Sequence, residues 1–593
     1  MIAQRLDALR KLMKENGIDA YVIPSADAHQ SEYVASYWKS REWISGFTGS
    51  AGLAVVTLDH ANLWTDGRYY IQAEKQITGS EFELFKAGTP GVPTFIEWLA
   101  DSMKPGTTVG FDGRTFSVTE IRQMIKLFKT KKIAVKADKD LIDILWADRP
   151  AIPKEPLFEH AVTFAGKNRT EKLSSLREYM RTKNTTHYIV TTLDDIAWLY
   201  NLRGHDMPSL PVFYAYTLIG LTTAKLYIDM DKITPEIASS LKKDGVEVYS
   251  YETIRSHLES LSATDIVGYD PDRLNCMLEQ AIPAATERYE EYLHVILMKS
   301  PKNTVEIGNI RNCYIKDCVA LEKFFYWLET HIGKEPITEI SAEEKLLTFR
   351  KAQDLFIEPS FYPISAYRAN AAMMHYRATL DDHAELKPEH FYLLDSGGHY
   401  LDGTTDITRT VALGPISEEE IKDFTLVLKS VINLSIINFV YGSTGTHLDV
   451  LARRPMWEHG MDYKCGTGHG VGMLGSVHEA PQRFVNNGIN TFKLEEGMLI
   501  TNEPGVYKAG KHGIRTENTL LVQKGDFTEY GGQFMNFETL TYCHIDTDAI
   551  DVALLTETER HWLNNYHEQV FSKISPFLSP EEKTWLKKKT KAV

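Results

Sequence analysis

Apolar residues recur with helical spacing twice in the first half of the chain, and each time a short apolar strand follows. The first succession covers Arg5–Ile23 and the second covers Lys172–Val190. At this fixed offset the two segments share identical residues: Leu6 with Leu173, Leu9 with Leu176, Arg10 with Arg177, Met13 with Met180, and Tyr21 with Tyr188. Strand patterns follow in each copy, at Leu53–Leu58 and Ala224–Ile228. We therefore predict a diverged duplication of an α/β domain of roughly 150 residues.

Two proline-containing segments predict where these domains end. The stretch Arg149–Pro156 contains three prolines and separates the two copies, and a second boundary falls at Ser300-Pro301. With 593 residues the chain is too long for one core. We predict domains at residues 1–153, 154–300 and 301–593.

The last domain has a different pattern, in which strands alternate with long helices. A helix with one apolar face is predicted over Val305–Thr330, and others over Glu418–Val440 and His447–Glu458. Apolar strands are predicted at Phe391–Leu394, Met498–Thr501 and Asn518–Val522. This is an α+β domain, and all the segments with recognisable chemistry lie inside it.

Composition narrows the class of protein. The chain is 43% hydrophobic and 24% charged, with a formal net charge of −15, which argues against binding nucleic acid or an anionic membrane. No stretch approaches the ~20 apolar residues of a membrane span, and the N-terminus lacks a signal-peptide pattern. The five cysteines are unclustered, as expected of free thiols in a reducing compartment. We expect a cytoplasmic protein.

Two aspartates stand on either side of a predicted hairpin turn. The segment His390–Leu413 has an apolar strand ending at Asp395, a Gly397-Gly398 turn region and a Thr-rich strand that begins at Asp406. We expect the two carboxylates nearly opposite each other, with Cβ atoms about 5 Å apart. Carboxylates this close repel each other unless cations lie between them.

Three further residues suit the same site. His469 lies in the glycine-rich run Gly466–Gly472, which lets the backbone approach bound ions closely. Glu503 and Glu517 stand at the ends of apolar strands. Any one of the five residues alone has an ordinary structural explanation, but together they favour a pair of divalent ions. Such a pair activates a shared water, so the sequence predicts a dinuclear metallohydrolase.

Other chemistries fit less well. No lysine follows the glycine-rich run as a phosphate-binding loop requires, and no Gly-x-Ser-x-Gly nucleophile motif is present. His478-Glu479 resembles the start of a zinc-protease helix, but Gln482 replaces the second histidine and Pro481 disfavours a helix. His375 and His478 remain as candidates for acid–base or hydrogen-bonding work.

At these residues the chain resembles the pita-bread metallopeptidases, and specifically the X-prolyl aminopeptidases of the cytosolic three-domain type. The metal motifs occur in that family's order. The likeness also covers four other segments: Trp43–Gly52, Trp64–Tyr69, Trp198–Gly204 and Trp562–Tyr566. It implies two creatinase-like α/β domains followed by a pita-bread catalytic domain with a C-terminal extension. The implied activity is hydrolysis of the N-terminal Xaa-Pro bond of peptides.

The resemblance also implies a role for each residue. Asp406 and Glu517 would bridge two metal ions, Asp395 would bind one, and His469 with Glu503 the other. Glu503 would also act as the general base, His375 would lie beside the scissile bond and the proline pocket, and His478 would bind the substrate carbonyl. The implied metal is Mn²⁺, and the implied assembly is a homodimer.

Cys465 departs from the family pattern, because many relatives have a histidine four residues before the metal-binding histidine. A thiol is a weaker hydrogen-bond donor and can be oxidised, so we expect substrate contacts to differ there. Alternatives are a prolidase specific for Xaa-Pro dipeptides, a methionine aminopeptidase, and a creatinase-like or metal-free peptide-binding relative. The two front domains favour the aminopeptidase over a prolidase or a methionine aminopeptidase. The complete set of five ligands disfavours a creatinase-like or metal-free relative.

Overall fold

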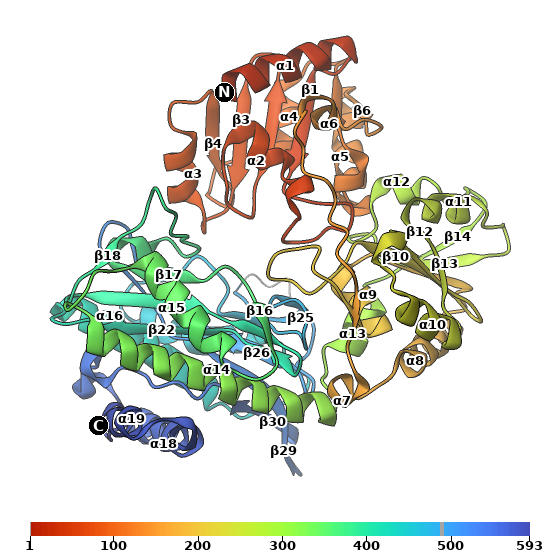
Figure 1. Ribbon diagram of the computed structural model, residues 1–593. Coiled ribbons are helices and arrows are strands. Elements are labelled where there is room, and N and C mark those ends of the chain that lie inside the picture. The colour runs from red at the N-terminus through yellow and green to blue at the C-terminus, as the bar shows by residue number, and fades with distance from the viewer. Residues whose placement is uncertain (1, 487–490) are drawn as a thin grey trace. The chain divides into compact units, whose positions relative to one another are not determined.

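The computed structural model describes residues 2–486 and 491–593 (Figure 1). The chain divides into two compact units, residues 1–159 with 167–295 and residues 160–166 with 296–593. None of the helices in the described residues has the length and apolarity that crossing a bilayer requires.

The first domain is a six-stranded mixed sheet with helices on its faces. Its strands, in spatial order, are β4 (Phe82–Lys86), β3 (Ala61–Thr65), β2 (Leu53–Thr57), β1 (Ala20–Pro24), β5 (Thr108–Phe111) and β6 (Ala134–Lys136). Its helices are α1 (Ile2–Glu15), α2 (Ser40–Ser45), α3 (Tyr70–Ile77), α4 (Phe95–Ser102), α5 (Val118–Lys131) and α6 (Leu141–Leu145). On α1, Leu6, Leu9 and Met13 are fully buried, as their helical spacing predicts.

The second domain repeats this topology strand for strand. Its order is β12 (Glu247–Ser250), β11 (Ala224–Ile228), β10 (Ala215–Gly220), β8 (His187–Val190), β13 (Ile266–Tyr269) and β14 (Glu287–Glu290). In each sheet the first strand in chain order, β1 or β8, pairs antiparallel with one neighbour and parallel with the other. The helices are α8 (Arg169–Thr182), α9 (Leu193–Tyr200), α10 (Pro235–Lys243), α11 (Ile254–Glu259), α12 (Cys276–Glu279) and α13 (His294–Lys299). The predicted duplication is therefore confirmed.

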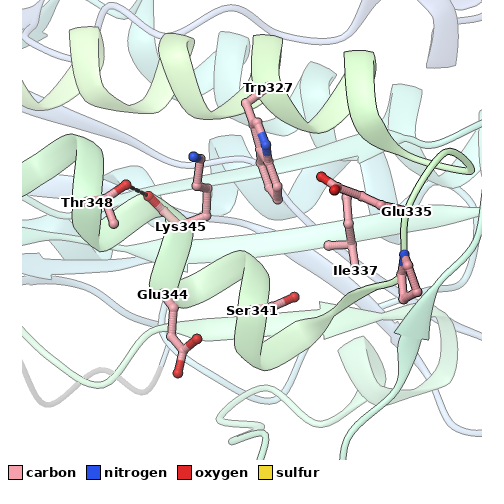
Figure 2. A pocket seen from close by; sticks show the side chains of 8 residues that line it. Trp327, Glu335, Ile337, Ser341, Glu344, Lys345 and Thr348 are labelled. Atoms are coloured by element: carbon pink, nitrogen blue, oxygen red, sulfur yellow. Dashed lines mark hydrogen bonds between the residues drawn. The ribbon is translucent and has the colours of Figure 1, made fainter.

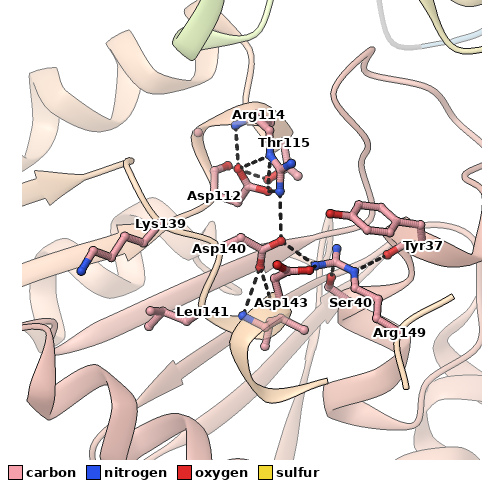
Figure 3. Close-up of polar contacts among 12 residues, drawn as sticks. Tyr37, Ser40, Asp112, Arg114, Thr115, Lys139, Asp140, Leu141, Asp143 and Arg149 are labelled. Atoms are coloured by element: carbon pink, nitrogen blue, oxygen red, sulfur yellow. Dashed lines mark hydrogen bonds and ion pairs between the residues drawn. The ribbon is translucent and has the colours of Figure 1, made fainter. Parts of the chain in front are cut away.

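The proline-rich segment between the two sheets, which we predict to be the linker, has no regular secondary structure over residues 151–157. Arg149, the first residue of the predicted linker Arg149–Pro156, is held by residues of the first domain (Figure 3). The Arg149 guanidinium donates to Asp140 at 2.7 Å and to the carbonyl of Tyr37 at 2.8 Å, and it lies 3.9 Å from the Tyr37 ring centroid. A cation stacked on an aromatic face and paired with a carboxylate is a stable anchor for the start of a linker.

The second unit contains the α+β domain. A six-stranded sheet has the order β23 (Phe439–Val440), β30 (Gly532–Thr539), β29 (Asn518–Thr528), β26 (Leu499–Asn502), β24 (Gly468–Gly470) and β25 (Glu479–Phe484). Four smaller sheets accompany it among the described residues: β17 (Ile364–Tyr367), β19 (Phe391–Ser396) and β22 (Ile407–Ala412); β16 (Phe356–Pro359), β20 (Gly398–Tyr400) and β21 (Gly403–Thr404); β27 (Gly505–Lys508) with β28 (His512–Arg515); and β15 (Ile337–Thr338) with β18 (Glu385–Leu386).

Long helices pack against these sheets. They are α14 (Thr304–His331), α15 (Glu339–Lys351), α16 (Glu418–Ser435) and α17 (Gly445–Trp457), followed at the C-terminal end by α18 (Glu557–Ile574) and α19 (Pro580–Lys589). The prediction that one helix extends to Val440 is wrong, because α16 ends at Ser435 and Phe439–Val440 pairs with β30. A single core joins α14, α16 and α18 to the strands, through buried residues such as Phe324, Val427 and Leu563.

Candidate metal centre

The predicted hairpin carries the two aspartates, but with an offset. Strand β19 pairs antiparallel with β22, and the residue opposite Asp395 is Thr408, two positions after Asp406. The expectation that the aspartates lie directly opposite each other is therefore corrected: they are diagonal neighbours on the same face. A diagonal pair is about 7–8 Å apart, and this wider spacing leaves room for cations between the carboxylates.

Asp406, His469 and Glu517 meet at one point, although they are spread over more than a hundred residues of the sequence. One ligand atom from each lies within 4.8 Å of the other two. Nε2 of His469 lies 3.5 Å from Oδ2 of Asp406 and 3.3 Å from Oε1 of Glu503. Four of the five predicted ligands thus form one cluster of carboxylate and imidazole groups.

Asp395 joins this cluster electrostatically. Burial raises the pKa values of Asp406, Glu503 and Glu517, and the charge of Asp395 raises each of them further. Oδ1 of Asp395 and Oε1 of Glu517 are buried without a hydrogen-bond partner in the protein. Buried carboxylate oxygens without partners are costly, and divalent cations would satisfy them. The donor set therefore fits a dinuclear metal centre.

Hydrogen bonds hold three of the predicted ligands, Glu517, Glu503 and His469, in place. The amide of Glu517 donates to the carbonyl of Thr408 at 3.1 Å, and the Thr408 hydroxyl donates to Oε2 of Glu517 at 2.8 Å. The amide of Glu503 donates to the carbonyl of Thr467 at 2.8 Å. Nδ1 of His469 lies 2.9 Å from the carbonyl of Gly470, which directs Nε2 towards the carboxylates.

The glycines around His469 permit this approach. A Cβ at Gly468 would collide with the carbonyl of Thr501 on β26, and a Cβ at Gly470 would collide with the carbonyl of Glu479 on β25. Strand β24 therefore lies between β25 and β26 only because both positions lack a side chain. This is the physical reason for the glycine-rich run.

Arg515 is a member of the site that the motifs in the sequence did not predict. Its buried guanidinium donates to Oδ2 of Asp395 and, at 2.7 Å, to the hydroxyl of Tyr507. Arg515 stands two residues before Glu517, and side chains at i and i+2 share a face of an extended chain. This spacing in the sequence could have identified Arg515 as a neighbour of Glu517.

The two additional histidines lie in different elements. The ring of His478 lies edge-on to His469, with centroids 4.3 Å apart, so the structure brings it to the cluster. His375 lies in the turn after the short 3-10 helix at Arg368–Ala372, which packs against β27 and β28. These two strands lead to Glu503 and Glu517.

A buried carboxylate anchors the turn that carries His375. Glu339, at the start of α15, is fully buried and accepts hydrogen bonds from the amides of Tyr367 and Ala384, both at 2.7 Å. It also accepts from the Tyr376 hydroxyl at 2.8 Å. The segment before and after His375 is thus fixed at both ends.

Cys465 lies in the loop between α17 and β24 and is partly buried. Its carbonyl accepts a hydrogen bond from Arg453 at 2.7 Å. Burial raises the pKa of the Tyr507 phenol, and Cys465 adds to this effect while Arg515 opposes it. Tyr507 in turn contacts Arg515. Cys465 therefore borders the site at the Tyr507 side.

A separate pocket lies between the end of α14 and the start of α15 (Figure 2). It has a volume of about 380 Å³ and is lined by Trp327, Ile337, Lys345 and neighbouring residues. None of the predicted site residues lines it.

Burial and mutual repulsion keep protons on the metal-free cluster. Burial, followed by the charge of Glu517, raises the pKa of Asp406 well above its usual range. Burial, followed by the charge of Glu503, does the same for the pKa of Glu517. Burial raises the pKa of Glu503 from 4.5 to about 7, with Asp395 adding to the effect and Arg515 opposing it.

These pKa shifts predict how stability without metal depends on pH. Between pH 4.5 and about 7 the folded metal-free protein binds more protons at Glu503 than the unfolded chain does, so its stability falls as the pH rises. Divalent ions remove this penalty because they compensate the negative charge. We expect the difference in Tm between metal-loaded and chelator-treated protein to grow from pH 5 to pH 8. A difference that stays constant in thermal scans over this range would contradict the assignment.

Comparisons with known proteins support the assignment of a metal centre to this domain. Residues 5–143 and 148–306 each match a family described as Creatinase/Prolidase N-terminal domain, residues 308–524 match Metallopeptidase family M24, and residues 533–593 match the C-terminal region of peptidase M24. The chain is 40% identical to Aminopeptidase P2 of Arabidopsis thaliana, with 98% of this chain and 86% of the relative covered. It is also 40% identical to a probable Xaa-Pro aminopeptidase P of Talaromyces marneffei, with 99% and 92% covered.

A solved structure extends the likeness to the whole fold. The X-prolyl aminopeptidase of Caenorhabditis elegans, described as a cytosolic enzyme with a di-nuclear active site, is 33% identical and superposes with a TM-score of 0.96 over 100% of both chains. The resemblance drawn from the motifs is therefore confirmed. This chain belongs to the X-prolyl aminopeptidase (aminopeptidase P) family of M24 metallopeptidases.

Proposed function

We propose that this protein is a metalloaminopeptidase that hydrolyses the N-terminal Xaa-Pro bond of peptides with two divalent metal ions. The family membership and the two duplicated front domains support the activity. The observation that carries the proposal is the cluster of Asp406, His469 and Glu517, with unpartnered carboxylate oxygens on Asp395 and Glu517.

Two divalent ions, when bound, lower the pKa of a shared water and polarise the substrate carbonyl. In the proposed site Asp406 and Glu517 would hold both ions, Asp395 would hold one, and His469 with Glu503 would hold the other. Buried carboxylates and a neutral imidazole are the donors that such ions prefer.

The side chains around the ions handle the proton and the peptide. We assign Glu503 as the base that takes the proton of the attacking water, because the family resemblance implies this role and its carboxylate lies 3.3 Å from the His469 imidazole, inside the cluster. His478, beside His469, donates a hydrogen bond to the carbonyl oxygen as negative charge develops there. His375 lies beside the scissile bond, and Cys465 contributes to the substrate pocket.

Proline at the second position makes a specialised site necessary. The Xaa-Pro amide has no N–H, and its nitrogen carries a ring, so a pocket built to accept an amide hydrogen bond is mismatched. The products are a free amino acid and a peptide that begins with proline.

A comparison of substrates tests the activity. We expect a purified, metal-loaded sample to cleave Xaa-Pro-Yaa tripeptides at the first bond, with kcat/KM about 10-fold or more above that for Xaa-Pro dipeptides. The same tripeptides with alanine in place of proline serve as the control. Cleavage confined to dipeptides would indicate a prolidase instead.

We also propose Mn²⁺ as the metal, a homodimer as the assembly and the cytoplasm as the location. The oxygen-rich ligand set with one imidazole and no thiolate supports Mn²⁺. The hairpin between β29 and β30 exposes Phe527 and Tyr530, and exposed aromatic side chains are typical of protein contacts. Elemental analysis of protein purified without added metal tests the proposal of Mn²⁺. Sedimentation equilibrium tests the proposal of a homodimer, for which we expect a mass twice 67.4 kDa.

A further inference from the structure

A buried ion pair lies beneath the hairpin that carries the two aspartates. Asp317 on α14 and Arg350 on α15 are 0% and 1% exposed, and the guanidinium donates to both carboxylate oxygens, at 2.8 and 3.0 Å. Neither residue belongs to the metal cluster. Replacing a buried ion pair by apolar side chains is often neutral or stabilising, so stability alone is a weak reason for its presence.

This pair is bonded to the residues next to the two aspartates. The hydroxyl of Thr405, which directly precedes Asp406, donates to Oδ2 of Asp317 at 2.8 Å. Arg350 donates to the hydroxyl of Ser396, which directly follows Asp395, at 3.1 Å. One ion pair therefore contacts the hairpin immediately beside both metal-binding positions.

The turn between the aspartates has further links to α14. The Tyr400 hydroxyl donates to Oδ1 of Asp317 at 2.8 Å, so Asp317 accepts four hydrogen bonds and two of them come from the hairpin. Asp402 accepts from Asn312 at 2.8 Å and pairs with Lys316 at 2.7 Å. The whole turn is thus attached to one face of the helix.

Such an attachment matters because the aspartates repel each other. Asp395 and Asp406 are diagonal neighbours with like charges, and the β19–β22 ladder ends at the pair of Ser396 with Ile407, so Asp406 lies one residue beyond its last pair. Ligands of a two-metal site must hold their geometry to a fraction of an ångström. We infer that Asp317 and Arg350 are positioning residues that set the separation of Asp395 and Asp406 and thereby the affinity for the metal pair. This inference rests on the proposed metal-binding role of the two aspartates.

Matched threonine variants test the inference. Thr405→Val keeps the side-chain volume but removes the bond to Asp317. Thr425→Val is the control, because the hydroxyl of Thr425, in α16, is also buried. This hydroxyl donates to the carbonyl of Ile421 at 2.8 Å and accepts from the amide of Asp551 at 3.0 Å. The Thr405 hydroxyl likewise accepts from the amide of Gly398, at 2.9 Å. Each variant loses one donated and one accepted hydrogen bond, but only the bond donated by Thr405 goes to a carboxylate.

The readout is the Kd for Mn²⁺, measured by calorimetry on metal-free protein at a temperature where all samples are folded. We expect Thr405→Val to weaken binding of at least one ion by 10- to 100-fold, about the effect of losing an outer partner of a metal ligand, and Thr425→Val to change it less than twofold. Ser396→Ala, which removes only the contact with Arg350, provides a second variant if Thr405→Val folds poorly. Equal affinities in the wild type, Thr405→Val and Ser396→Ala would overturn the inference and leave the proposed function intact. A wild type that binds fewer than two ions would instead overturn the proposed function.

Discussion

Replacing Asp406 or Glu517 by alanine is expected to abolish turnover and release bound metal. Each carboxylate is proposed to bridge both ions, so one substitution removes a ligand from each of them. We expect kcat/KM for an Xaa-Pro-Yaa peptide to fall by about 10³-fold or more, since even a single catalytic hydrogen-bond donor contributes 10²- to 10³-fold. Metal content, measured by elemental analysis after gel filtration, should fall from two ions per chain to one or none.

The loss should be specific to metal binding. Without bridging ions, removing one of several mutually repelling carboxylates relieves repulsion, so the metal-free variants should be at least as stable as the metal-free wild type. Comparing Tm values in chelator tests this. Variants at Asp406 and Glu517 that both retain two ions would refute the bridging assignment.

Replacing His478 by alanine is expected to give the opposite combination, slow turnover with both metals bound. The His478 ring lies beside His469 and is proposed to stabilise negative charge on the substrate oxygen rather than to bind metal. Loss of such a donor lowers kcat by about 10²-fold. Steady-state kinetics and elemental analysis on the same sample measure both quantities.

His478→Gln provides the matched variant, because its amide can still donate a hydrogen bond from a similar position. We expect it to recover part of kcat. Metal loss in His478→Ala would move this residue from the substrate-binding group to the ligand set.

The sequence was informative where a pattern repeats or where several unusual residues coincide. The two front sheets follow from matched residues such as Leu6 with Leu173, because apolar spacing fixes which face of a helix is buried. The five metal ligands were predicted because separate positions combined carboxylate or imidazole groups with glycine and strand ends. No single one of them would have been sufficient.

Other features depend on contacts that no local pattern encodes. The offset between Asp395 and Asp406 is set by the register of β19 and β22, and a glycine-containing turn allows more than one register. The end of α16 at Ser435 depends on pairing of Phe439 with β30, a long-range contact. Asp317 reaches the hairpin from a helix almost ninety residues earlier, through side-chain bonds that sequence spacing cannot reveal.

A crystal structure of the Mn²⁺-loaded protein, with anomalous diffraction recorded at the manganese edge, tests the central claim most directly. We predict two anomalous peaks about 3.5–4 Å apart, with oxygen or nitrogen atoms of Asp395, Asp406, His469, Glu503 and Glu517 within coordination distance of one or both. A single peak, or any of these five side chains turned away from both ions, would contradict the dinuclear assignment.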